Sequence, residues 1–234
     1  MTMHASTIDS IRKSLVGLRM PRALEALDAT LRRIEQGEID GIQAFDELLV
    51  EELTLRESRR IKAALMMARL TTIKTLAGFD FAFQPSLDRN RIMALAELKF
   101  IERAEVVHLL GPPGTGKTHL AVALGREAIR QNYNVQFITA VTLVAMLAKA
   151  HADGSLDKQL TTLSRPKLLI IDELGYLPFE ANAAHLFFQL VSRRYEKGSI
   201  LITSNRSVGE MGGAFLAIPL WPRRSWTACY TTPR

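Results

Sequence analysis

Eight consecutive residues, GPPGTGKT at 111–118, combine glycines, a lysine and a threonine at a spacing that suits phosphate binding. The glycines let backbone N–H groups converge on phosphate oxygens, and a helix that starts here adds its partial positive charge. The lysine reaches the β- and γ-phosphates of a nucleoside triphosphate, and the last threonine ligates Mg²⁺. The predicted nucleotide site consists of Gly111, Pro112, Pro113, Gly114, Thr115, Gly116, Lys117 and Thr118.

The surroundings of this loop distinguish it from an ordinary glycine-rich turn with a solvated lysine. The apolar run VVHLL (106–110) precedes the loop, and a helical segment follows Lys117, as a phosphate-binding loop requires. The turn interpretation is therefore disfavoured.

A second apolar run, LLIID (168–172), ends in a carboxylate that is followed by Glu173. Since open α/β sheets bind ligands at the carboxyl ends of their strands, Asp172 is predicted to hold Mg²⁺ together with Thr118. Glu173 is then placed to orient and deprotonate the water that attacks the γ-phosphate. The alternative for both carboxylates is a helix cap at the end of an acidic strand.

The run SILITS (199–204) predicts another strand, and Asn205 follows it. From a neighbouring strand end, Asn205 is predicted to hydrogen-bond the γ-phosphate or the attacking water. Taken alone, an asparagine after a strand is more often a turn residue, so this role depends on the two stronger motifs.

From residue 105 onwards, short apolar runs alternate with helical segments, and this alternation predicts an α/β fold. The expected strands are 106–110, 135–139, 168–172 and 199–204, with helices after Lys117, from Val141 and over 182–196. Such an order implies right-handed crossovers and a parallel sheet with helices on both faces. Upstream, residues 8–76 hold few helix breakers and carry apolar residues at helical spacing, which predicts about three helices.

The predicted organisation has four parts. They are a small helical N-terminal domain over 1–76, a linker with one helix over 77–104, a nucleotide-binding core over 105–212 and a tail over 213–234.

Composition describes a globular protein. Of its 234 residues 47% are hydrophobic, enough for a full core, and no apolar run approaches the roughly 20 residues that cross a bilayer. The N-terminus lacks the apolar centre of a secretory signal, and a single cysteine, Cys229, excludes an internal disulfide. We expect a cytoplasmic location and no membrane partner.

The formal net charge of +6 favours a polyanionic partner. Basic residues follow an acidic stretch near residue 55, and by default they form a solvated face. The alternative is contact with the phosphates of duplex DNA without sequence readout. The residues of this basic stripe are Arg56, Arg59, Arg60, Lys62, Arg69 and Lys74.

Two further pairs of residues have two interpretations each. Arg193 and Arg194 could face the nucleotide of a neighbouring protomer, or they could belong to a helix end beside Gly198. Phe79 and Phe81 could pack against adenine or dock on the core.

Together the segments GPPGTGKTHLA, LLIIDELGYLP and LVSRRYEKGSILITSN, with FDF at 79–81, resemble the IstB-like ATP-binding proteins. That family comprises ATPase helpers of insertion-sequence transposition within the AAA+ class, and the resemblance extends to about Gly212. It implies a Walker A motif at 111–118, a Walker B pair at Asp172 and Glu173, and sensor 1 at Asn205. It also implies ATP and Mg²⁺ as cofactors, oligomers assembled on duplex DNA through the helical domain, and recruitment of a transposase.

Two other functions stay open. The first is loading of a helicase in DNA replication, because helicase loaders are akin to this family. The second is a catalytically silent remnant that binds ATP or DNA without turnover. The partner protein separates transposition from replication, and ATP turnover separates both from the silent remnant.

The tail departs from the family that the chain resembles. The resemblance implies an arginine after Asn205 that reaches the neighbour's γ-phosphate, and a fifth strand beside 106–110, but the residues after Gly212 match neither. We therefore expect the C-terminal part of the core to be missing, the outer edge of the 106–110 strand to be uncovered, and ATP hydrolysis to be poor. With one choice of codons, reading 218–233 one base earlier gives the helical sequence DPAVATAILDRLLHHA, so we interpret the tail as out-of-frame translation.

Overall fold

The structure is a computed structural model that describes residues 2–70, 72–84, 87–174, 181–205 and 225–229. The chain divides into two compact units, Met1–Ala63 and Ala64–Arg234. None of the helices in the described ranges is long and apolar enough to span a membrane.

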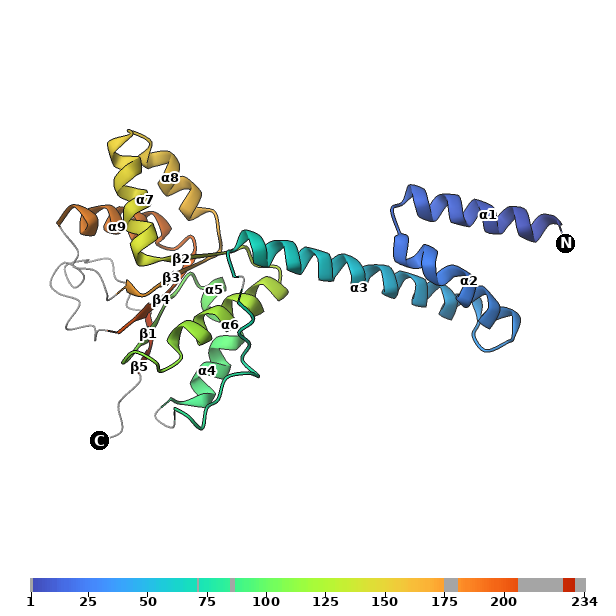
Figure 1. Ribbon diagram of the computed structural model, residues 1–234, viewed down its shortest axis with the longest axis horizontal. Coiled ribbons are helices and arrows are strands. Elements are labelled where there is room, and N and C mark those ends of the chain that lie inside the picture. Colours follow the sequence, from blue (N-terminus) through green and yellow to red (C-terminus); the bar gives the residue numbers. More distant parts are fainter. Residues whose placement is uncertain (1, 71, 85–86, 175–180, 206–224, 230–234) are drawn as a thin grey trace. The chain divides into compact units, whose positions relative to one another are not determined.

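The first unit is helical, as its sequence predicts. It contains α1 (Thr2–Gly17), α2 (Pro21–Glu35) and most of α3 (Gly41–Met67), which continues into the second unit (Figure 1). Pro21 occupies the first turn of α2, where its missing N–H costs no helical hydrogen bond. The residues that α2 buries are Ala23, Leu27 and Thr30, which recur at helical spacing and form its packed face.

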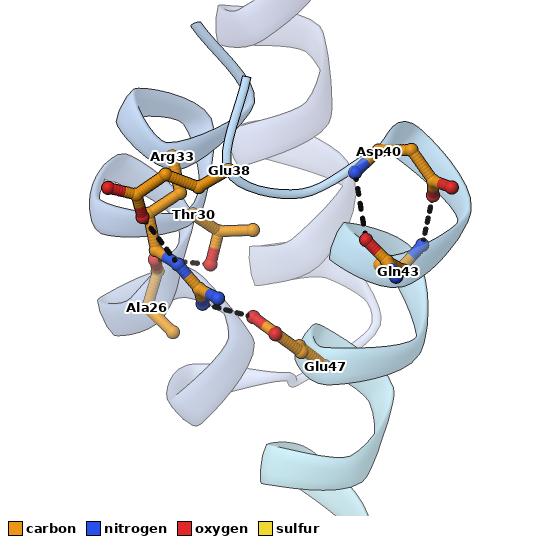
Figure 2. Close-up of polar contacts among 7 residues, drawn as sticks. All are labelled: Ala26, Thr30, Arg33, Glu38, Asp40, Gln43 and Glu47. Atoms are coloured by element: carbon orange, nitrogen blue, oxygen red, sulfur yellow. Dashed lines mark hydrogen bonds and ion pairs between the residues drawn. The ribbon is translucent and has the colours of Figure 1, made fainter. Parts of the chain in front are cut away.

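Polar contacts fix the connection between α2 and α3 (Figure 2). The Asp40 carboxylate accepts the Gln43 backbone N–H at 2.7 Å, and the Gln43 side chain accepts the Asp40 N–H at 3.1 Å. This reciprocal pair satisfies N–H groups that the first turn of α3 would otherwise leave open. Arg33 on α2 contacts Glu47 on α3 at 2.6 Å and so ties the two helices together.

A buried carboxylate organises the other end of this unit. Glu52 on α3 is 2% exposed and accepts the Arg22 backbone N–H and the Arg56 Nε–H, both at 3.0 Å. Arg56 also donates to the carbonyls of Leu18 and Arg19, at 3.1 and 3.0 Å, just beyond the end of α1. Glu52 and Arg56 together therefore connect α3 to the start of α2 and to the residues that follow α1.

The second unit is built on a parallel sheet, which confirms the predicted α/β class. Its strands are β1 (Val106–Leu110), β2 (Val135–Thr139), β3 (Leu168–Asp172), β4 (Ser199–Ser204) and β5 (Ser225–Cys229), in the order β2-β3-β4-β1-β5. The first four have the predicted bounds. The buried side chains along the full length of β1, β3 and β4 account for the mainly hydrophobic runs in the sequence.

The prediction that the outer edge of β1 is uncovered is wrong. Residues 225–229 of the tail pair in parallel with β1 along its full length, from Val106 opposite Ser225 to Leu110 opposite Cys229. Tail residues such as Trp226 and Thr227 have high β-propensity, and an apolar strand edge with open N–H and C=O groups favours pairing with such a segment.

Helices cover both faces of the sheet (Figure 1). On one face, α7 (Ala140–Ala152), α8 (Leu156–Ser164) and α9 (Ala181–Arg194) pack together over a core that includes Leu169, Ile171 and Ile202. On the other lie α6 (Lys117–Arg130), α4 (Arg89–Ala96) and the short α5 (Lys99–Glu102). Gly125 lets α6 approach the sheet closely, because a Cβ atom there would lie 2.6 Å from Ile170 Cδ1.

Candidate nucleotide-binding site

The glycine-rich loop connects β1 to α6, as predicted. Its backbone needs glycine at Gly114 and Gly116, whose φ angles of +79° and +82° lie in the left-handed region. The loop begins with the Gly111 N–H donating to the Ser204 carbonyl at 3.1 Å, which anchors it to β4. The N-terminus of α6 follows at Lys117, so its N–H groups and its dipole lie at the loop.

Gly116 is required for a second reason. A Cβ atom at this position would lie 2.6 Å from the Phe79 ring, which packs directly against the loop. The Phe79 ring also contacts the rings of Phe81 and His119, with centroids 4.8 and 5.3 Å apart. The aromatic side chains of the linker therefore dock on the core.

The Lys117 side chain contacts the phosphate-binding loop that precedes it. Its ammonium donates to the Pro112 carbonyl at 2.6 Å and to the Thr115 hydroxyl at 3.2 Å. Burial lowers the pKa of Lys117, while the charge of Asp172 acts in the opposite direction. These contacts hold the ammonium group against the Pro112 carbonyl and the Thr115 hydroxyl of the loop.

The predicted metal ligands meet at the end of the sheet. Asp172 closes β3 and is 4% exposed, and its Oδ1 accepts the Thr118 hydroxyl at 2.9 Å. The same oxygen accepts the hydroxyl of Thr203 on β4. A buried carboxylate with two hydroxyl neighbours offers the hard oxygen ligands that Mg²⁺ prefers. Sequence reasoning missed Thr203, since a threonine inside a strand gives no sign of its side chain's neighbours.

Glu173 has an unusual backbone for a residue with a Cβ atom. Its φ is +63°, and its N–H donates to the Thr203 hydroxyl at 2.9 Å. A non-glycine residue in the left-handed region is uncommon, and such strain clusters at functional sites. The exposed side chain of Glu173 lines the cavity beside the loop.

That cavity, of about 320 Å³, brings most of the predicted site together. Among its lining residues are Gly114, Gly116, Lys117, Thr118, Glu173 and Asn205. Asn205 Oδ1 is buried and has no hydrogen-bond partner among the described residues. An unpaired buried amide oxygen at the cavity suits a residue that hydrogen-bonds a ligand or a water.

A second cavity of about 650 Å³ lies on the linker side of α6. It is lined by Phe79 and Phe81, by Arg89 and Met93 of α4, and by residues of α6. The Arg89 guanidinium lies 5.6 Å from the centre of the Phe81 ring. Both aromatic residues therefore border a cavity between α4 and the later turns of α6.

The basic stripe is not one continuous helix face. Arg56, Arg59, Arg60 and Lys62 lie on α3, but Arg69 and Lys74 follow its end at Met67. Arg56 donates to backbone carbonyls, Arg60 contacts Glu57 at 3.6 Å, and Arg59 and Lys62 are exposed. Lys74 lies elsewhere, in the lining of the 320 Å³ cavity.

Arg193 and Arg194 have structural partners in the same unit. Arg194 is 1% exposed and donates to the carbonyls of Leu163, Pro166 and Ser199, at 2.8, 2.9 and 2.8 Å. Burial lowers its pKa to about 10. Arg193 contacts Asp157 at 2.6 Å. The segment after Asn205 in which the arginine finger is predicted to be missing, 206–224, lies outside the described residues.

Comparison with known proteins identifies sequence relatives that match most of the chain. The sequence model of the family described as IstB-like ATP binding protein matches residues 13–218. A protein of Geobacillus stearothermophilus, described as an ATP-binding protein of insertion sequence IS5376, is 42% identical over 83% of this chain and 78% of its own length. Its counterpart in insertion sequence IS21 of Pseudomonas aeruginosa is 42% identical over 85% of this chain and 75% of its own length.

Solved structures share the fold at low sequence identity. AMPPCP-bound DnaA from Aquifex aeolicus superimposes with a TM-score of 0.60 at 20% identity, covering 69% of this chain and 51% of that one. DnaI gives 0.57 at 19% identity over 69% and 92%, and the DnaC helicase loader gives 0.53 at 21% identity over 61% and 90%. These likenesses confirm the predicted AAA+ phosphate-loop fold.

Proposed function

Because the chain belongs to the family of IstB-like ATP-binding proteins, we propose that it binds ATP with Mg²⁺ and assists a transposase on duplex DNA. The observation that carries the nucleotide site is the meeting of the loop with the end of β3, where Thr118 Oγ1 lies 2.9 Å from Asp172 Oδ1. The printed descriptions of the relatives, which tie them to insertion sequences, support the role in transposition.

Within the site, Lys117 and the loop N–H groups bind the phosphates, and Thr118 and Asp172 hold Mg²⁺. When bound, this ion supplies charge neutralisation on the β- and γ-phosphates. Desolvation of Asp172, which is 4% exposed, supports the assignment, because a buried carboxylate is stabilised by a cation.

Hydrolysis is assigned to the two residues that follow the strand ends. Glu173 takes the proton of the attacking water, and Asn205 positions that water or the γ-phosphate through its unpaired Oδ1. The left-handed backbone of Glu173 and the hydrogen bond from its N–H to Thr203 support this role, because they fix the position of the backbone that carries the carboxylate side chain.

DNA binding is assigned to the exposed cations of α3. Arg59 and Lys62 are exposed, and Arg60 is partly exposed, so their charges can reach phosphates. Self-assembly on DNA is supported by large apolar side chains that the helical unit exposes, including Ile42 at 82%, Phe45 at 65% and Leu53 at 64%.

The nucleotide assignment is tested by replacing the phosphate-binding lysine. Lys117→Ala removes a charge-assisted contact of about 1.5–3 kcal/mol, so affinity for a fluorescent ATP analogue should fall roughly ten- to a hundredfold. Lys158→Ala, an exposed lysine of α8 outside both cavities, is the matched control and should bind as the unchanged chain does. Equal affinity in Lys117→Ala and the control would refute the site.

The competing functions are helicase loading in DNA replication and that of a catalytically silent remnant. The partner is tested by incubating the protein, ATP and duplex DNA with the transposase of an insertion sequence of this type, or with a replicative helicase. ATP-dependent capture of the transposase alone is expected. Capture of the helicase alone would replace transposition by helicase loading, and binding without turnover or partner would favour a silent remnant.

A further inference from the structure

Lys74 lies in a different environment from the basic stripe to which its sequence position assigns it. The helix that carries most of that stripe ends at Met67, and Lys74 follows in the connection between α3 and α4, which is called the linker below. Its neighbours in the wall of the 320 Å³ cavity are Gly114, Gly116, Lys117 and Thr118 of the phosphate-binding loop. Lys74 is thus a cation beside the loop that is contributed from outside the loop.

The linker around Lys74 is held against the start of α6. The next residue, Thr75, offers its carbonyl to His119 Nε2 at 2.9 Å, and His119 lies in the first turn of the helix. Phe79 packs against Gly116 and lies 5.3 Å from the His119 ring, centre to centre. The contacts of Thr75 with His119 and of Phe79 with Gly116 therefore hold the backbone near Lys74 against the loop and the first turn of α6.

The charges of the cavity leave Lys74 without an acidic partner. Lys74 is partly exposed, and no carboxylate among the described residues lies within ion-pair distance of it. Among the residues that the structure describes, the cavity lining holds one carboxylate, Glu173, and two ammonium groups, Lys74 and Lys117. A cavity with this balance favours a polyanion, and lysine binds phosphate as a point charge.

We propose that Lys74 is a second phosphate-binding lysine, which contacts the β- and γ-phosphates of the nucleotide together with Lys117. This inference rests on the proposed nucleotide site and adds to it a residue of the linker. It also removes Lys74 from the set of predicted DNA contacts. Nucleotide binding then holds the linker to the loop by a charge as well as by the contacts of Thr75 and Phe79.

The experiment compares Lys74→Ala with Lys158→Ala and Lys62→Ala, using fluorescent analogues of ATP, ADP and AMP. Lys74 is partly exposed, so its loss should weaken ATP binding by roughly three- to tenfold, less than loss of Lys117. The loss should be smaller for AMP, which lacks both outer phosphates. Lys74→Arg should restore most of the affinity, and thermal unfolding without nucleotide should match that of the unchanged chain.

In DNA binding, the expected effects of Lys62→Ala and Lys74→Ala are the reverse of those in ATP binding. In protein without nucleotide, Lys62→Ala should flatten the slope of log K against log[salt] by about 0.9, while Lys74→Ala should leave it unchanged. Flattening by Lys74→Ala, with unchanged ATP affinity, would return Lys74 to the DNA contacts and overturn the proposal. An equal loss for ATP and AMP would also overturn it. If the unchanged chain and Lys117→Ala bind ATP equally, the nucleotide site itself fails, and that result is distinct from a failure of Lys74 alone.

Discussion

Thr203 on β4 donates its hydroxyl hydrogen to the Asp172 carboxylate at the end of β3, and the same oxygen accepts the Glu173 N–H at 2.9 Å. One side chain therefore contacts both the carboxylate proposed to bind Mg²⁺ and the backbone of the glutamate proposed as the general base. The neighbouring strand supplies it, so the register between β3 and β4 is part of the site.

Replacing this hydroxyl should affect both stability and hydrolysis. Thr203→Val keeps the volume but leaves the Glu173 N–H and one lone pair of Asp172 without their partner, which should cost about 1–3 kcal/mol in the free energy of unfolding. Urea denaturation measures this cost, and the hydrolysis rate should fall by a larger factor than ATP affinity. Thr203→Ser retains the hydroxyl and should remain close to the unchanged chain. Equal stability of the valine and serine variants would contradict the role of the hydrogen bonds.

Substitutions at Glu173 and Lys117 should affect different properties, the hydrolysis rate and the ATP affinity respectively. Glu173→Gln removes a general base but keeps the shape of the side chain, so single-turnover hydrolysis should slow by roughly 10²–10⁴ while ATP affinity is retained. Lys117→Ala should instead lose affinity. Rapid-quench measurement of bound ATP separates the two variants. A glutamine variant that hydrolyses at the original rate would show that another group takes the proton.

On α3, the cations proposed to bind DNA differ from Arg56, which has structural contacts. Replacing Arg59, Arg60 and Lys62 together by alanine should flatten the salt slope of duplex DNA binding by roughly two to three units. Arg56→Ala should mainly destabilise the helical unit, because Arg56 donates to the carbonyls of Leu18 and Arg19 and pairs with buried Glu52. Filter binding over a salt series and thermal unfolding measure the two effects. A slope unaltered by the triple change would make the α3 cations a solvated face.

Stability should depend on pH through His108, which lies within β1 and is 3% exposed. Burial lowers its pKa to about 4, against an ordinary value near 6.5. Between these values the unfolded chain binds a proton that the native chain does not. The stabilisation is therefore complete above about pH 6.5 and is lost as the pH falls toward 4, by about 1.4 kcal/mol per pH unit.

The comparison with His108→Gln isolates this contribution. Urea unfolding at pH 7.5, 6.0 and 5.0 should show a steeper loss of stability in the unchanged chain than in the glutamine variant. Parallel losses in the two proteins would mean that other groups cause the acid sensitivity.

The strands and the loop were predictable because their residues carry strong local signals. β1, β3 and β4 are mainly apolar runs that are buried along their full length, while β2 is buried only in part, and the glycines of the loop occupy backbone conformations that other residues avoid. The register between strands is a tertiary property. The sequence therefore placed Asp172 and Glu173 at a strand end but gave no sign that Thr203 lies beside them.

The end of α3 shows why Lys74 was assigned to the basic stripe. Helices commonly end at a glycine in the left-handed conformation, but here Arg69 takes that role with a φ of +61°. The Arg69 N–H donates to the Met66 carbonyl and the Leu70 N–H to the Leu65 carbonyl, at 3.0 and 2.9 Å. Leu70 is 2% exposed, so its burial offsets the strain of a non-glycine residue. Without a glycine to mark the end, the sequence pattern extends the helix as far as residue 76.

Arg194 has a consequence for the lifetime of the folded state. The guanidinium donates to the carbonyls of Leu163 and Pro166, which precede it by 31 and 28 residues, and to that of Ser199, five residues after it. Its hydrogen bonds require α8, α9 and β4 to be assembled, so we expect them to form late in folding. Interactions absent from the folding transition state act mainly on the unfolding rate. Arg194 should therefore slow unfolding. In stopped-flow experiments, Arg194→Met should increase the unfolding rate and leave the refolding rate almost unchanged.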